Sequence, residues 1–227
     1  MVLLFLLSLG CSPALRMPGP LGGLGEVPTA PPAPVTEQRA TATAFGADAI
    51  VAAAQGFVGK RTLEVEGQRF RYDCSGLVEA VMAASGGDYA GSSAMMYERA
   101  QGEGALRRRR RLSPGDLVFF DDTYDRDGNG RRDDPLSHVA LVEAVAPDGT
   151  ATLIHLSSRG VVRIRMNLQE PDLHSGPTGE VLNDYLRAKK AGDGPRTRYL
   201  AGELWAGTAT LAPETRRGRA DDAVAGR

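Results

Sequence analysis

Residues 72–78 read Tyr72-Asp73-Cys74-Ser75-Gly76-Leu77-Val78, and apolar residues then recur at helical spacing as far as Gly86. The pattern predicts a helix that begins at Cys74 and ends before Gly86, because glycine readily takes the left-handed conformation that closes a helix. The unbonded N–H groups at a helix start favour a thiolate, so we expect a lowered pKa for Cys74. The small residues after it leave space for a substrate, and the Cys74 N–H would face a developing oxyanion. On this stretch alone, an amphipathic helix with an idle cysteine is the alternative.

Outside this stretch, the sequence predicts helices first and strands later. Apolar residues at helical spacing indicate a first helix between Phe45 and Gly59, and 94–99 has some helical character. Short apolar runs bounded by turn residues predict strands at 116–120, 138–142, 151–156 and 161–166, with a last one within 198–211. This order is typical of an α+β fold, with N-terminal helices packed on an antiparallel meander.

The chain has two cysteines, Cys11 and Cys74. Cys11 follows an apolar run that fits a signal peptide and is too short for a membrane span, so Cys11 would be lipidated or removed. Cys74 would then be unpaired in an exported protein, where a free thiol is a liability unless its chemistry is used. A buried, inert cysteine is the alternative.

The two ends of the chain are predicted to lie outside the folded domain. Residues 1–11 resemble a signal peptide with a lipoprotein-type cleavage site, and the alternatives are a plain cleaved signal or a misassigned start. Residues 12–43 are rich in Pro and Gly and predict a disordered tether, while 212–227 predict a disordered tail. We therefore expect one domain at 44–211 in a protein exported to the cell envelope, either periplasmic or anchored to the membrane by a lipid.

The charge pattern excludes one class of partner. The formal net charge is −1, from 27 basic and 28 acidic residues that are intermixed along the chain. A nucleic-acid-binding protein usually carries a basic patch or an excess of positive charge. We therefore expect no nucleic-acid partner.

The candidates for a base that accepts the thiol proton are the three histidines, His138, His155 and His174. His138 opens an apolar strand, so its ring is expected to project toward the helix start while Val139 and Leu141 point to the other face. Antiparallel pairing of the next strand is expected to bring His155 near His138, with one bulge or a diagonal contact absorbing part of the offset in register. His155 would then orient His138, as the third member of a Cys-His-polar arrangement does.

Four blocks of the sequence now carry a family resemblance: Asp73-Cys74-Ser75-Gly76-Leu77-Val78, Pro114-Gly115-Asp116-Leu117-Val118-Phe119-Phe120, Ser137-His138-Val139-Ala140-Leu141-Val142 and Ile154-His155. In this order they resemble the signature of the NlpC family of cell-wall endopeptidases. The resemblance implies a papain-like fold and hydrolysis of peptide bonds in peptidoglycan stems, often between D-glutamate and a diamino acid. Carried over, it makes Cys74 the nucleophile, His138 the base and His155 the orienting residue, with Tyr72, Asp73 and Ser75 lining the substrate site.

The predicted function is therefore a cysteine endopeptidase that acts on peptidoglycan and needs no cofactor for its chemistry. Three alternatives stay open. An amidase that cuts the glycan-to-peptide bond of N-acetylmuramoyl-L-alanine uses similar Cys and His blocks. The other two are a non-catalytic wall-binding module and a zinc site formed by the same Cys-His-His set.

An acidic segment before His138 resembles the start of a calcium-binding loop, with oxygen-bearing side chains at alternate positions and a glycine at the turn. The candidate ligands are Asp125, Asp127, Asn129 and Asp133, and Asp134 is an alternative to Asp133. The twelfth position is Leu136, where a full EF-hand has a bidentate acid. The sequence leaves open a structural calcium ion and a hydrated acidic loop.

Overall fold

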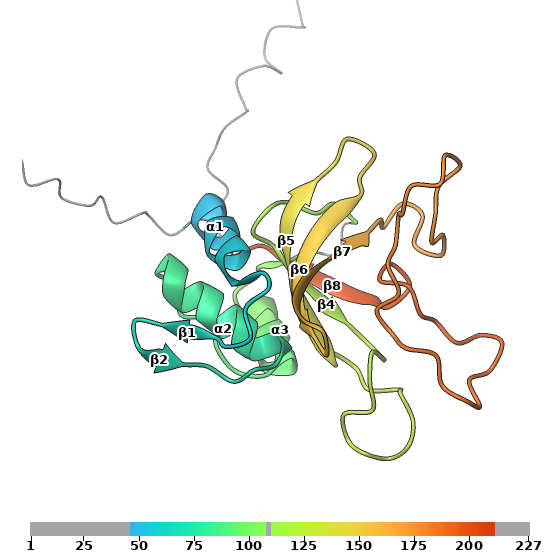
Figure 1. The fold of residues 1–227 in the computed structure, drawn as a ribbon, viewed down its shortest axis with the longest axis horizontal. Helices are drawn as coiled ribbons and strands as arrows, with labels where there is room; N and C mark the ends of the chain where they lie inside the picture. The colour runs from blue at the N-terminus through green and yellow to red at the C-terminus, as the bar shows by residue number, and fades with distance from the viewer. Residues whose placement is uncertain (1–45, 108–109, 212–227) are drawn as a thin grey trace, which may run out of the picture. The chain divides into compact units, whose positions relative to one another are not determined.

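The computed structural model describes residues 46–107 and 110–211 and has an α+β fold (Figure 1). The helices are α1 (Ala47–Phe57), α2 (Cys74–Ser85) and α3 (Ser93–Gly102). The strands are β1 (Glu64–Val65), β2 (Gln68–Arg69), β3 (Leu106–Arg107), β4 (Leu117–Phe120), β5 (His138–Val145), β6 (Ala151–Ser157), β7 (Gly160–Met166) and β8 (Trp205–Ala209). The predicted signal peptide, tether and tail lie outside the described residues.

The main sheet has six antiparallel strands in the order β3-β8-β4-β5-β6-β7. Strands β4 to β7 form the predicted meander, each paired with the next along the chain. The last strand, β8, lies between β3 and β4. The ladder between β5 and β6 begins only at the pair Leu141 and Ile154, so the first residues of β5 are not paired with β6.

Local chemistry explains both ends of α2. Asp73 accepts a hydrogen bond from the N–H of Gly76 at 2.7 Å and so caps the helix start. Gly86 has φ of 80° and closes the helix in the left-handed conformation, as its sequence predicts. Both predicted boundaries of the Cys74 helix are therefore confirmed.

The sheet has a hydrophobic core on each face. The helix-side core joins α1, α2 and α3 to one face of the sheet and includes Val139, Leu141 and Ile154. The second core includes Ala140, Val142 and Leu153 from the opposite face, together with Leu168 and Leu204. Figure 1 shows the helices on one side of the sheet and the long segment 167–204 on the other.

Segment 167–204 is ordered by side-chain hydrogen bonds, with isolated bridges in place of extended ladders. The Asn183 side chain is fully buried; its oxygen accepts from the N–H groups of Asn167 and Gly202, and its nitrogen donates to the carbonyls of Glu170 and Leu173. This one side chain satisfies four backbone groups that a ladder would otherwise pair. None of the three helices in the described ranges is long and apolar enough to cross a bilayer.

Candidate active site

Cys74 is the first residue of α2, as the sequence predicts. The hydroxyl of Ser75 donates to Asp73 Oδ1 at 3.1 Å, and that same oxygen caps the helix. The turn needs glycine at position 76, because a Cβ there would lie 1.9 Å from the carbonyl oxygen of Arg71. The sequence Asp-Cys-Ser-Gly therefore fixes the backbone that carries the thiol.

The backbone of β5 meets the thiol of Cys74. Val142 exchanges hydrogen bonds with the residues before β4, so its N–H points toward β4. Because successive N–H groups of a strand point to opposite sides, the N–H of Val139, three residues earlier, points toward β6. That N–H is not used by the β5–β6 ladder, and it is one of the backbone groups that lower the pKa of Cys74. The sulfur is therefore next to the residue that directly follows His138.

The thiol is neutral in this half-buried site. Burial raises the pKa of Cys74 above its ordinary value, and the charge of Asp73 raises it further. The N–H groups of Val139, Ser75 and Cys74 itself lower the pKa, but they do not outweigh burial. The expectation of a lowered pKa was wrong, because packing of protein atoms around the half-buried thiol outweighs the effect of the helix start.

The structure brings His138 and His155 together. Nε2 of His138 lies 2.9 Å from Nδ1 of His155, and the two rings are nearly perpendicular. Burial lowers the pKa of His138 to about 3, helped by the charge of His155, and lowers that of His155 to about 4. Both imidazoles are therefore neutral at ordinary pH. Nε2 of His155 is buried and has no hydrogen-bond partner among the described residues.

The predicted facing of β5 was wrong. Val139 and Leu141 belong to the helix-side core, whereas the His138 ring lies 6.1 Å from that of Phe120, which packs in the second core. His138 is the first residue of β5, where β5 is not yet paired with β6. Its backbone can therefore lie near Cys74 although its ring lies on the side of Phe120.

The other predicted residues are placed as follows. Tyr72 is 42% exposed, and its hydroxyl donates to the carbonyl of Lys60 at 2.9 Å. Ser75 is buried, and its role in binding substrate stays a prediction. His174 is bonded to the carbonyl of Asn183 at 2.7 Å and packs on Tyr185, so it has a structural setting.

Tyr124 is a residue that sequence reasoning missed. It is 46% exposed, and its pKa is raised by burial and by the charge that Cys74 carries as a thiolate. Its neighbour Thr123 bonds through N–H and hydroxyl to the hydroxyl of Ser137, which directly precedes His138. The path of this loop brings Tyr124 close enough for the two charges to interact, and no local motif in the sequence marks the residue.

The acidic segment forms a compact loop between β4 and β5. Ligand oxygens of Asp125, Asp127 and buried Asp134 lie within 4.8 Å of one another. Asp133 is not in this group and lies 3.9 Å from Arg131, so the acid that converges is the alternative, Asp134. Calcium binding stays a prediction.

Comparison with protein families matches residues 65–156 to the CHAP domain. No curated protein matches the chain. The matched segment contains Cys74, His138 and His155, although the NlpC family named from the motifs is not the one matched. A CHAP domain indicates a peptidoglycan hydrolase, either an amidase or a peptidase. Residues 65–156 thus match the CHAP domain, which is a cysteine/histidine-dependent amidohydrolase or peptidase, and this match is consistent with a papain-like cell-wall peptidase family.

Proposed function

We propose that this protein is a cysteine peptidase that hydrolyses peptide bonds in the stem peptides of peptidoglycan. Cys74 is the nucleophile, His138 is the general base and His155 orients His138. The observation that carries the proposal is the placement of the thiol against the start of β5, with the His138 ring bonded to His155 at 2.9 Å. A CHAP domain over the same residues supports it.

Either ring could donate the hydrogen bond between the histidines, and the proposed role of His138 selects one arrangement of the protons. For His138 to accept the thiol proton on Nδ1, its Nε2–H must donate to Nδ1 of His155. His155 then carries its own proton on Nε2, the buried atom without a partner among the described residues. His155 thereby holds His138 in the one tautomer that can act as a base toward Cys74.

The reaction then follows from a neutral thiol and a neutral imidazole. As the sulfur attacks the carbonyl carbon of the scissile bond, the thiol proton moves to Nδ1 of His138. The Val139 N–H stabilises negative charge on the sulfur. The Cys74 N–H, at the start of α2, is the proposed donor to the developing oxyanion. Protonated His138 then gives its proton to the leaving amine, and water hydrolyses the acyl-enzyme with His138 again acting as base.

The substrate and location are proposed on the motifs. The NlpC resemblance favours the bond between D-glutamate and a diamino acid, with Tyr72, Asp73 and Ser75 lining the substrate site. We propose export to the cell envelope, with Cys11 as the lipid-bearing residue and 12–43 as the tether that lets the domain reach the wall.

The test is mass spectrometry of purified muropeptides treated with wild type, Cys74→Ala and Cys11→Ala. Wild type and Cys11→Ala are expected to release stem-peptide fragments with free amino groups, and Cys74→Ala is expected to release none. Full activity in Cys74→Ala would refute the proposal. Release of intact stems from the glycan would favour the amidase, and wall binding without cleavage would favour a non-catalytic module. Stoichiometric zinc in the purified protein would favour the metal site.

A further inference from the structure

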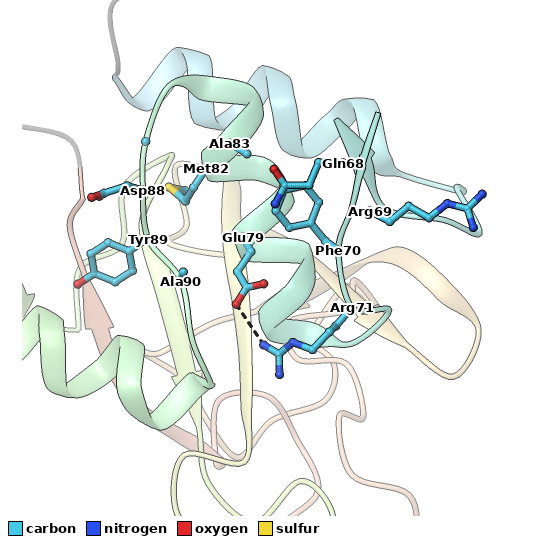
Figure 2. Close-up of a pocket in the computed structure, with 11 residues that line it drawn as sticks. Gln68, Arg69, Phe70, Arg71, Glu79, Met82, Ala83, Asp88, Tyr89 and Ala90 are labelled. Atoms are coloured by element: carbon cyan, nitrogen blue, oxygen red, sulfur yellow. Dashed lines mark hydrogen bonds and ion pairs between the residues drawn. The ribbon is translucent and has the colours of Figure 1, made fainter. Parts of the chain in front are cut away.

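Arg71 lies three residues before Cys74, and its side chain contacts three other residues of the described structure. Its guanidinium Nη2 lies 3.1 Å from Glu79 Oε1 and donates to the carbonyl of Gly91 at 3.2 Å, while Nη1 lies 3.7 Å from Asp73 Oδ2. Glu79 also accepts the N–H of Gly91 at 2.8 Å. Figure 2 shows Glu79 reaching from α2 toward Arg71. The Arg71 side chain is thus bonded both to α2 and to the loop that follows α2.

Asp73 divides its two oxygens between the helix and Arg71. Oδ1 accepts the hydrogen bonds that cap α2, and Oδ2 faces the guanidinium. The carboxylate lies beside the thiol, where its negative charge opposes the formation of a thiolate. A cation held on Oδ2 offsets that charge.

The same residue holds the turn through its backbone. The Arg71 carbonyl packs against Cα of Gly76, so closely that no side chain fits between them. A shift of the Arg71 backbone would therefore move the first turn of α2 and the sulfur with it.

We propose that Arg71 is a positioning residue for Cys74, which fixes the Asp73 carboxylate and offsets its charge beside the sulfur while Glu79 and Gly91 hold the guanidinium in place. This role rests on the proposed function, in which Cys74 is the nucleophile. The Val139 N–H from β5 and Tyr124 from the β4–β5 loop also act on the thiol, and changes at Arg71 leave both groups in place.

The effect should be on the reactivity of the thiol more than on stability. Arg71 and Glu79 meet at the wall of a pocket of about 410 Å³, and the Arg71 side chain is 56% exposed. Exposed ion pairs stabilise a fold very little, because water screens them. A change in thiol reactivity without a matching loss of Tm therefore separates positioning from a structural role.

The experiment measures the rate of alkylation by iodoacetamide against pH, in a Cys11→Ser background where Cys74 is the single thiol. Arg71→Met is expected to raise the apparent pKa of the thiol and to lower the alkylation rate at pH 7 about threefold, the effect of about half a pKa unit. Arg71→Lys should recover most of the rate, because a positive charge returns beside Asp73. The matched control is Arg69→Met, which removes an exposed arginine that pairs with Glu64, and its rate should stay within about twofold of wild type.

Equal alkylation profiles for Arg71→Met and Arg69→Met would overturn the proposal, as would a fall in Tm without a change in the profile. If Arg71→Met does not fold, Glu79→Gln is compared with Glu64→Gln, and equal rates there are equally decisive. Alkylation does not require substrate. A wild type that leaves muropeptides intact would thus refute the proposed function while the effect at Arg71 was still measured.

Discussion

His155 is the residue on which the tautomer of His138 depends. His155→Ala removes the acceptor 2.9 Å from His138 Nε2, so His138 would lose both its orientation and its preferred proton position. We expect kcat on muropeptides to fall on the order of a hundredfold with KM little changed, in line with the size of general-base effects. His155→Asn, which offers a carbonyl acceptor, should recover part of the loss. The control is His174→Asn, and equal losses at positions 155 and 174 would argue against an orienting role.

The three proposed catalytic residues could be predicted because their types are scarce in this chain. Cys74 stands before a helix pattern, and only three histidines were available to partner it. Tyr124 could not be predicted, since its approach to the thiol depends on the path of a loop. The direction of the Cys74 pKa shift was missed because the sequence indicates a helix start but not how deeply the start is buried.

At the scale of elements, α2 depends on Gly76. In Gly76→Ala the new Cβ would overlap the Arg71 carbonyl, and backbone on both sides leaves little room to relax. We expect the free energy of unfolding to fall by about 3 kcal/mol or more, in the range of severe overpacking. Gly56→Ala is the matched control: its Cβ meets nothing within 4 Å in α1, and it should stabilise the protein by up to about 1 kcal/mol. Chemical denaturation of both variants measures the difference, and similar values would contradict the steric argument.

The β4–β5 loop is where a calcium ion would act. If the converging oxygens of Asp125, Asp127 and Asp134 bind calcium, millimolar CaCl₂ should raise Tm by a few degrees while equal MgCl₂ does not, because magnesium requires a smaller octahedral site. Asp125→Asn should remove the calcium-dependent increase. The control is Asp133→Asn, since Asp133 lies outside the converging group. No change of Tm with calcium would leave the hydrated loop as the correct interpretation.

Element prediction succeeded where an apolar period was long enough to recognise. Helices α1 and α2 and strands β4 to β7 lie within about two or three residues of the predicted spans, and β8 lies inside the predicted range 198–211. The short strands β1, β2 and β3 were missed because two residues cannot display a period. Segment 167–204 was not predicted because Asn183 orders it through backbone hydrogen bonds, and one asparagine in a sequence does not indicate four such bonds.

At the scale of the whole molecule, the two buried histidines tie stability to pH. The pKa values of His138 and His155 are lowered to about 3 and about 4 in the fold, whereas an unfolded chain has about 6.5. The unfolded chain thus binds more protons between pH 6.5 and 4, so stability is complete above pH 6.5 and is lost as pH falls through this window. We expect a loss of roughly 2 kcal/mol per histidine between pH 7 and 4.5.

The comparison that isolates this effect is wild type against His155→Asn, because acid also weakens other interactions. The variant lacks one of the two groups that must be protonated on unfolding, so its free energy of unfolding should fall less steeply with pH. Denaturation at pH 7, 5.5 and 4.5 measures both slopes, and parallel slopes would mean that the unfolded chain does not gain the expected proton. Because the same burial that keeps His138 neutral also causes this acid sensitivity, a hydrolase of this design is expected to work at neutral pH and to lose stability in acid.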